Sequence, residues 1–288
     1  MQILGLHHDL AAGPLGEGER RGDRGVLHDP GASLSGSPDV VVSDLDRHVR
    51  HFPVRPGRDR PTYRTGVRAF VIANADDADP GFVGHHLRTK GYAFTECHRE
   101  RPAEWPDLAG ADLVLLLGSE WSVYWPRVAE SVKAECALVK SAHEQGIPIL
   151  GICFGAQIVA HALGGSVERA ARPEVGWHRI ESDVAEVAPG PWLQWHFDVC
   201  RVPPTFTELA RSDSGPQVFT ARRTLATQFH PEATESMLAL WTGGSPDELA
   251  RLGLSPDGIM ADTRRFVTQS RPAAERVVDW FCEAIANS

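Results

Sequence analysis

The chain has 288 residues, of which 42% are hydrophobic, and its formal net charge at pH 7 is −9. This length and apolar content suffice for one large buried core, near the upper limit for a single domain. The acidic balance gives no sign of a nucleic-acid surface, and no run approaches the roughly 18 apolar residues that a membrane-spanning helix needs. We therefore expect a protein that binds neither nucleic acid nor membrane. Because the N-terminus also lacks an apolar signal-peptide core, we expect it to be cytoplasmic.

Residues 1–66 differ in composition from the rest of the chain. They are dense in Gly, Pro, Asp and Arg and show no sustained apolar period, so we predict a disordered extension. The segment also has no Lys, the first being Lys90. Such a composition would equally suit translated upstream sequence, with the true start near Val67.

From Val67 onward, strands and helices are predicted in alternation. The predicted strands are 67–75, 92–97, 112–117 and 147–150, and the predicted helices are 81–90 and a segment from Pro126 to Gly146. The continuous apolar run 112–117 is typical of a strand that is buried on both faces of a parallel sheet. Alternation at this spacing indicates right-handed βαβ units, and hence a three-layer, doubly wound, mostly parallel α/β structure. In such sheets the active site lies beyond the carboxyl ends of the strands.

A cysteine stands between a strand and a helix, in the sequence IPILGICFGAQIVAHAL over 147–163. The apolar run enters a Gly-x-Cys-x-Gly turn with Cys153 at its apex. Gly151 and Gly155 lack a Cβ, which a backbone this cramped requires. The thiol then lies at a helix N-terminus, where the helix dipole favours the thiolate. This pattern predicts a catalytic nucleophile, whereas an isolated cysteine is more often part of the core.

The second half of the chain predicts a different arrangement. Shorter strands are expected at 166–170, 176–182, 216–222 and 224–230, as a mixed or antiparallel extension of the sheet. From Ala233 the pattern is helical, with segments at 234–241, 246–253, 259–269 and 273–285. We therefore expect a main domain over 67–235 and a C-terminal helical appendix, over 236–288, packed on the core.

A second chemical motif, QFHPE over 228–232, lies at the end of the last predicted strand. Cysteine chemistry on an amide requires a base for the thiol proton, a group that orients this base, and donors for the oxyanion. His230 at the end of a strand suits the base. Glu232 lies two residues on, across the turn fixed by Pro231, and could reach the other nitrogen of the imidazole.

Together GICFGAQ and QFHPE resemble the motifs of the class I glutamine amidotransferase family, the triad type of glutaminase domain. The resemblance covers roughly 67–234 and includes the segments LLGSEWSVY and QWHFD. It implies a flavodoxin-like fold and a cysteine that attacks the glutamine carboxamide, releasing ammonia, before water cleaves the γ-glutamyl thioester. By motif position it implies Cys153 as nucleophile, His230 as general base and then acid, and Glu232 as the orienting carboxylate.

The resemblance also implies an oxyanion hole made by the backbone N–H groups of Phe154 and Ser119. The family usually has a Gly-Gly pair where this chain has Gly118-Ser119. A residue with a Cβ restricts positive φ, so this loop is either set differently or presents the Ser119 amide in an ordinary conformation.

Five residues are implied in substrate binding by the same resemblance. Gly118 lies in the oxyanion loop and Gln157 ends the first motif. Trp195, His196 and Asp198 match a loop that reads Ser-His-Gly-Asp in relatives, and Phe197 replaces its Gly. The alternative for Gln157 is a polar residue on its helix, and for the other three it is packing of the loop.

Three functions remain open from the sequence. The first is a glutaminase that hydrolyses the side-chain amide of glutamine, with the ammonia passing to a separate synthase. The second is a hydrolase of γ-glutamyl amines or peptides that uses the same triad, and the third is a catalytically idle regulatory or binding subunit. The chain shows no phosphate-binding P-loop, so any acceptor chemistry is expected on another protein. Five cysteines without a C-x-x-C pair argue against a disulfide framework and a zinc site, and we expect neither a metal nor a cofactor.

Overall fold

The computed structural model describes residues 66–288. The extension predicted over 1–66 therefore lies outside the described residues, apart from Gly66. Within the described part, no helix combines the length and the apolar character needed to cross a membrane.

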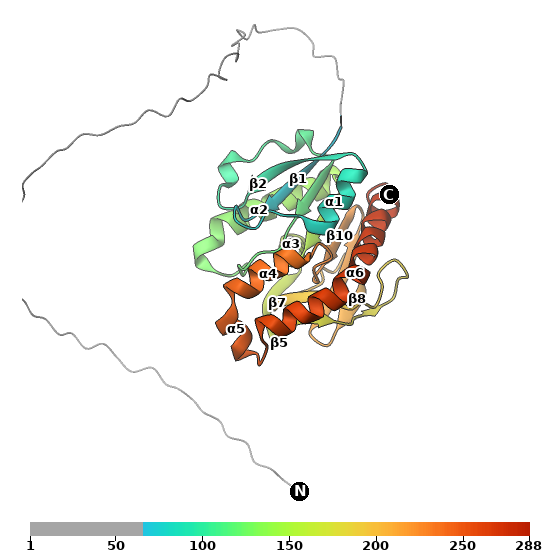
Figure 1. The fold of residues 1–288 in the computed structure, drawn as a ribbon. Coiled ribbons are helices and arrows are strands. Elements are labelled where there is room, and N and C mark those ends of the chain that lie inside the picture. The colour runs from blue at the N-terminus through green and yellow to red at the C-terminus, as the bar shows by residue number, and fades with distance from the viewer. Residues whose placement is uncertain (1–65) are drawn as a thin grey trace, which may run out of the picture. The chain divides into compact units, whose positions relative to one another are not determined.

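The centre of the fold is a mixed eight-stranded sheet (Figure 1). Its strand order is β2-β1-β3-β4-β10-β9-β8-β6. The strands are β1 (Val67–Ala73), β2 (Tyr92–His98), β3 (Leu113–Leu116), β4 (Ile149–Ile152), β6 (Glu181–Ser182), β8 (Thr207–Ser212), β9 (Gly215–Ala221) and β10 (Thr224–Thr227). Pairing is parallel from β2 to β10 and antiparallel from β10 to β6. The predicted doubly wound α/β sheet with an antiparallel extension is confirmed.

Helices cover both faces of this sheet because its central strands are apolar on both sides. One face packs against α1 (Gly81–Thr89) and the second half of α6 (Pro256–Trp280), forming one hydrophobic cluster. The other face packs against α2 (Ala129–Gln145) and α3 (Phe154–Ala162), forming a second cluster. The three layers place the carboxyl ends of β1, β3, β4 and β10 along one edge, where a site can form.

The helix α2 illustrates how local sequence sets an element. Pro126 opens a 3-10 turn, η3 (Pro126–Val128), which leads directly into α2. Val132 and Val139 are buried on its inner face. Gly146 caps the C-terminus in the left-handed conformation, with φ 69°, which a residue without a Cβ adopts readily. The predicted end of this helix at Gly146 is confirmed, whereas the α-helix begins at Ala129, after the 3-10 turn that Pro126 opens.

One sequence-based prediction is corrected by a second, two-stranded sheet. The segment QWHFD, expected to be a loop, lies within β7 (Trp192–Arg201), which pairs antiparallel with β5 (Ser166–His178). Trp195, His196 and Asp198 are therefore strand residues. Buried and half-buried side chains alternate along β7, as in a half-buried strand, and the ladder with β5 satisfies its backbone. The residues that pair with it, such as Val175 opposite Trp195, lie outside the motif, so the motif alone did not reveal the strand.

The C-terminal region is helical as predicted, with α4 (Glu235–Gly244) and α5 (Pro246–Arg251) before α6. The helices expected separately over 259–269 and 273–285 are instead one helix, α6, which passes through Pro272 and ends in a π turn, Phe281–Ile285. A proline inside a helix costs about 3 kcal/mol. Both halves bury apolar side chains, Ile259 against β5 and α4 residues and Val277 against the main sheet, and this burial outweighs that cost.

Candidate active site

Cys153 lies at the junction of β4 and α3 in a strained backbone conformation. Its φ is 51° and its ψ is −106°. Among residues 66–288, Cys153 and Arg222 are the two non-glycine residues with positive φ. Such a conformation costs on the order of 1–3 kcal/mol. The surrounding sheet holds it in place, since the Cys153 N–H donates to the Thr227 carbonyl at 2.8 Å.

Steric contacts explain why glycine stands on either side of the cysteine. A Cβ on Gly155 would lie 2.2 Å from the carbonyl oxygen of Leu116, on the neighbouring strand β3. A Cβ on Gly151 would lie 2.8 Å from the carbonyl oxygen of Gly155. Real Cβ atoms do not approach so closely, so only glycine permits the helix to start this near the sheet. The expectation drawn from the Gly-x-Cys-x-Gly spacing agrees with this geometry.

His230 and Glu232 follow the end of β10 and face the same cavity as Cys153. The Nδ1 atom of His230 lies 2.7 Å from Oε1 of Glu232, and both side chains are buried. The backbone N–H of His230 donates to the Leu193 carbonyl, and this hydrogen bond connects the turn to β7. The other side of the turn is held by α1, because the Phe82 N–H donates to the Glu232 carbonyl at 2.9 Å.

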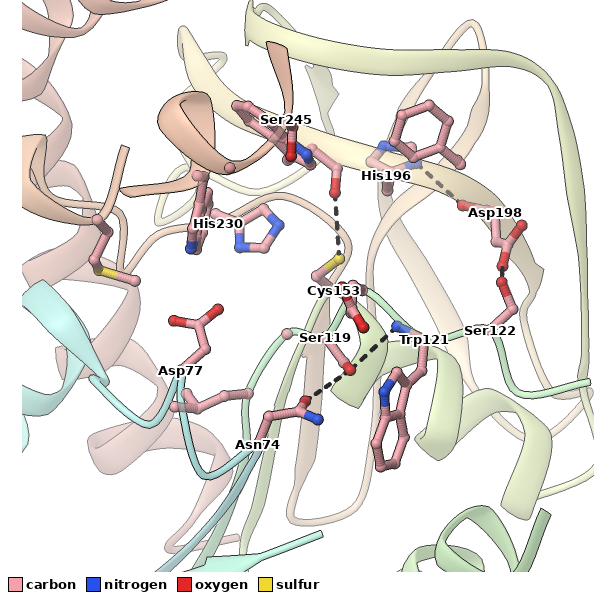
Figure 2. A pocket seen from close by; sticks show the side chains of 18 of the residues that line it. Asn74, Asp77, Ser119, Trp121, Ser122, Cys153, His196, Asp198, His230 and Ser245 are labelled. Carbon is pink, nitrogen blue, oxygen red and sulfur yellow. Dashed lines mark hydrogen bonds between the residues drawn. The ribbon is translucent and has the colours of Figure 1, made fainter. Parts of the chain in front are cut away.

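The electrostatics of His230 suit proton transfer with a thiol. Burial by itself would lower the pKa of this imidazole, but the negative charges of Glu232 and Cys153 outweigh burial and hold the pKa well above 6.5. Its Nε2 atom is buried without a hydrogen-bond partner, whereas Nδ1 is engaged by Glu232. The ring therefore presents one unengaged nitrogen in the cavity that contains Cys153 (Figure 2).

The loop after β3 carries the predicted oxyanion donor. Ser119 is not among the residues with positive φ, so it presents its amide in an ordinary conformation, the second of the two alternatives considered. Its hydroxyl donates to Oδ1 of Asn74 at 2.7 Å and accepts from the Trp121 N–H at 3.2 Å. The Ser119 side chain thus fixes the loop (Figure 2). At Gly118 a Cβ would lie 3.0 Å from Cε1 of His230, which explains the glycine there.

A buried arginine, Arg99, holds this loop from behind. Its guanidinium donates to the carbonyl oxygen of Gly118 at 2.7 Å and to that of Leu117 at 3.1 Å. In a trans peptide the carbonyl and the following N–H point in opposite directions. With the Gly118 carbonyl turned toward Arg99, the Ser119 N–H is directed away from Arg99.

The charge of Arg99 is balanced inside the core by Glu135 of α2. The Arg99 Nε lies 3.0 Å from Oε1 of Glu135, and both side chains are fully buried. Burial raises the pKa of the Glu135 carboxyl, and the positive charge of Arg99 opposes that rise. Sequence reasoning missed Arg99, because an arginine just after a strand is normally exposed and only the tertiary structure shows its burial.

The residues predicted to bind substrate line one cavity of about 660 Å³ together with Cys153. Gln157 lies buried on α3. The Asp198 carboxylate accepts hydrogen bonds from the hydroxyls of Ser122 and Tyr124, and Figure 2 shows the bond from Ser122. Asp198 therefore joins the strand β7 to the segment that follows the oxyanion loop.

His196 is engaged on both ring nitrogens. Its Nε2 lies 3.1 Å from Oε2 of Glu174 and its Nδ1 lies 3.1 Å from the Asp198 carbonyl oxygen. Both partners are hydrogen-bond acceptors, so both ring nitrogens of His196 already have partners within the protein. For His196 this geometry favours the alternative in which the residue packs the segment rather than binding substrate.

Two further cavity residues, Asp77 and Trp241, were missed by sequence reasoning. The Trp241 ring, from α4, meets the His230 ring edge-on at a centroid distance of 5.0 Å and the Trp195 ring at 5.9 Å. Burial, together with the nearby charge of Glu232, raises the pKa of Asp77, while a hydrogen bond from Trp241 opposes the rise. Neither residue stands in a motif, so the sequence offered no signal for them.

Among residues 66–288, no cluster of three or more His, Cys, Asp or Glu side chains is arranged to hold a metal ion.

Comparison with known proteins places this geometry in a family. Residues 90–238 match the family model "Glutamine amidotransferase class-I". A GMP synthase [glutamine-hydrolyzing] from Aquifex aeolicus is 37% identical over 182 residues, which cover 59% of this chain and 34% of that protein. One from Thermomicrobium roseum is 37% identical over 134 residues, covering 43% and 24%. The chain thus spans about a third or less of the length of these curated relatives.

Solved structures show the same fold. A glutamine amidotransferase from Thermotoga maritima has a TM-score of 0.68 and 26% identity, covering 76% of this chain and 99% of that one. A glutamine amido transferase from Methylobacillus flagellatus has a TM-score of 0.66 and 22% identity, covering 77% and 95%.

Proposed function

The chain is a cysteine-dependent enzyme of the class I glutamine amidotransferase family, and we propose that it cleaves the side-chain amide of glutamine through a thioester on Cys153. One observation carries this proposal. Cys153, in its strained backbone conformation, lines the same cavity as the buried pair His230 and Glu232, whose Nδ1 and Oε1 atoms are 2.7 Å apart. The same set of side chains argues against a catalytically idle subunit, which would have no need to retain the strain at Cys153.

In the first half of the reaction, His230 accepts the thiol proton and the Cys153 sulfur attacks the amide carbon. The negative charge that develops on the amide oxygen is stabilised by the N–H groups of Phe154 and Ser119. Glu232 orients the imidazole and stabilises its positive charge. His230 then donates its proton to the amide nitrogen, the C–N bond breaks, and ammonia leaves a γ-glutamyl thioester.

In the second half, water replaces the amine beside His230. The imidazole takes a proton from this water as the oxygen attacks the thioester carbon, and the same two N–H groups bind the new oxyanion. The C–S bond breaks and glutamate is released. The thiol regains its proton, so the enzyme returns to its initial state.

The amino-acid end of the substrate would lie on the side of the cavity formed by α3 and the strands β5 and β7. Asp198 and Arg169 line that side with opposite charges, and the buried Gln157 on α3 lines the same cavity. An α-amino and an α-carboxylate group call for such a pair. Phe197 stacks on the Arg169 guanidinium at 4.8 Å and would hold it in place.

The curated relatives are named as GMP synthases that hydrolyse glutamine. This chain spans a third or less of their length, and we propose that a synthase partner uses the ammonia. The domain boundaries at 67–235 and 236–288, and the cytoplasmic location, remain predictions.

The test is the release of ammonia and glutamate from glutamine by the wild-type protein and by Cys153→Ala. We expect release by the wild type and a loss of at least about 10³-fold in the variant, because the nucleophile and base act as a unit. The proposal would be overturned if both proteins released ammonia and glutamate at equal rates. It would also be overturned if hydroxylamine trapped no γ-glutamyl thioester during turnover.

A further inference from the structure

The side of the cavity near His230 is where the leaving amine must lie. His230 has to protonate that nitrogen, and its Nε2 is buried and without a partner. Figure 2 shows His230 and Asp77 on one side of Cys153, opposite His196, Asp198 and Ser122. A substituent on the leaving nitrogen would therefore extend past His230, away from the side assigned to the amino-acid end.

The cavity as a whole is larger than glutamine needs. The whole cavity has a volume of about 660 Å³, which is in the range of sites for ligands well beyond the size of one amino acid. The helices α4 and α5 also line this cavity, through Trp241, Met237 and Glu248. Of these residues, Trp241 contacts the ring of His230 directly, so α4 borders the cavity beside the catalytic histidine.

The cavity is acidic, and two of its carboxyl groups and one indole ring lie close to His230. Among the described residues that line the cavity, carboxyl side chains far outnumber the single guanidinium, that of Arg169. Asp77 is half-buried close to Glu232, and Oε2 of Glu232 is buried without a hydrogen-bond partner. The Trp241 ring, which is edge-on to His230, lies beside these carboxylates. Carboxylates combined with an indole face are the surroundings that organic cations prefer.

Resting on the proposed function, we propose that the preferred substrate is the γ-glutamyl amide of a diamine or polyamine. Asp77 and Trp241 would bind the distal ammonium group of such an amine, and Glu248 would add negative charge at the entrance. The reaction uses one water. The Cys153 sulfur adds to the amide carbon, and the C–N bond of the resulting oxyanion breaks as His230 gives its proton to the departing amine. Water then cleaves the thioester, so the products are glutamate and the free cationic amine.

The experiment compares kcat/KM on a matched set of γ-glutamyl amides, followed by released glutamate. γ-Glutamyl-1,4-diaminobutane and γ-glutamylpentylamine differ only in exchanging a terminal ammonium for a methyl group. γ-Glutamyl-γ-aminobutyrate carries a negative charge instead, and glutamine has no substituent. We expect the cationic amide to be favoured over the neutral one by about 10- to 100-fold, the range of one charge-assisted contact, and the anionic amide to be slowest.

Variants locate the source of this preference. Asp77→Asn is expected to reduce the ratio of cationic to neutral substrate to within about threefold, because it removes the charge that faces the ammonium. Trp241→Leu should lower the same ratio, in addition to any general loss from its contact with His230. Glu144→Gln removes one exposed carboxylate on α2, outside the cavity, and should leave the ratio unchanged.

The outcomes separate the two levels of the proposal. Equal turnover of the cationic and neutral amides by the wild type, or a ratio that survives in Asp77→Asn, would overturn the assignment of a cationic amine. Glutamine as the fastest substrate would overturn it as well, while the proposed glutaminase function stood. Absence of Cys153-dependent glutamate release from every member of the set would overturn both.

Discussion

At the scale of single residues, Cys153 differs from the other cysteines of the chain in its surroundings. It lies at the start of α3 beside a cavity, whereas burial raises the pKa of Cys97 and of Cys136 to about 11 and that of Cys200 to about 12. Burial also raises the pKa of Cys282. Thiols with such values are protonated and unreactive at neutral pH.

We therefore expect iodoacetamide at about pH 6.5 to label Cys153 before the other four cysteines, because only the thiolate reacts. The measurement is peptide mass spectrometry over a time course. Cys136→Ser serves as the control and should leave the labelling rate unchanged. Uniform labelling of all five cysteines would contradict the assignment of Cys153 as an activated nucleophile.

Arg99 acts on the oxyanion loop without touching the cavity contents. Its guanidinium donates hydrogen bonds to the carbonyl oxygens of Leu117 and Gly118, and these bonds set the direction of the Ser119 N–H. Replacing it should free this peptide to rotate. Loss of one oxyanion donor lowers kcat by on the order of 10²-fold, so we expect Arg99→Met to lower kcat by about that factor and to change KM much less.

The single variant also leaves Glu135 buried and unpaired, which costs about 3–5 kcal/mol of folding free energy. The control is the double variant Arg99→Met/Glu135→Leu, which replaces the ion pair by apolar side chains and should recover most of that stability in urea unfolding. Its kcat should stay low. Recovery of both stability and kcat would assign Arg99 a purely structural role.

At the scale of elements, the strand pair β5–β7 depends on a buried polar network. Oε2 of Glu174, on β5, lies 3.1 Å from Nε2 of His196 and accepts from the Ser212 hydroxyl and the Gln217 amide at 2.9 Å each. Burial alone would raise the pKa of Glu174, but the hydrogen bonds and charge of His196, together with Ser212, outweigh it and lower the pKa below 4.5.

A carboxyl whose pKa is lowered by folding contributes stability that is present above its unfolded pKa, near 4.5, and is lost as pH falls through the lower folded value. We expect Glu174→Gln to be less stable than wild type by about 1–3 kcal/mol at pH 7, and this difference to shrink below pH 4.5. Urea unfolding between pH 7 and pH 3 measures it.

Glu168→Gln provides the matched control on the same strand. Glu168 is exposed and pairs with the exposed Arg201 at 2.7 Å, so its replacement should cost less than about 1 kcal/mol at any pH. A pH-independent loss in Glu174→Gln would show that its charge contributes nothing to the stability of the network.

At the scale of the whole molecule, the C-terminal helix belongs to the main core. Ala274, Val277, Val278 and Phe281 are buried in the same cluster as the apolar side chains of β1, β3 and β4. The first half of α6 instead contacts β5 and α4, where Trp177 donates to the Thr263 hydroxyl at 3.0 Å. One helix thus connects the sheet with the wall of the cavity.

We expect Phe281→Ala to lower the free energy of unfolding of the described fold by about 3–5 kcal/mol, since this side chain is fully buried. Unfolding should remain a single transition by far-UV circular dichroism and tryptophan fluorescence. Leu240→Ala, at a side chain that is 75% exposed, should change stability by less than about 0.5 kcal/mol. A separate early transition confined to the C-terminal helices would instead indicate an independent appendix.

The sequence alone determined the features that arise from local rules. Hydrophobic runs and glycine positions specified the strands of the parallel sheet, the end of α2 and the tight turn at Cys153, because strand burial, helix capping and a cramped turn act on neighbouring residues. The motif around His230 likewise indicated a base with its carboxylate, since both stand in one turn. These predictions needed no knowledge of distant partners.

Tertiary structure decided what depends on residues far apart in sequence. The segment around Trp195 became a strand because β5 pairs with it, and α6 continues through Pro272 because two different surfaces bury its halves. Arg99 reaches the oxyanion loop from the turn after β2, and Asp77 and Trp241 meet beside His230 from segments far apart in the sequence. Burial and long-range contact set these arrangements, and neither is encoded in local periodicity.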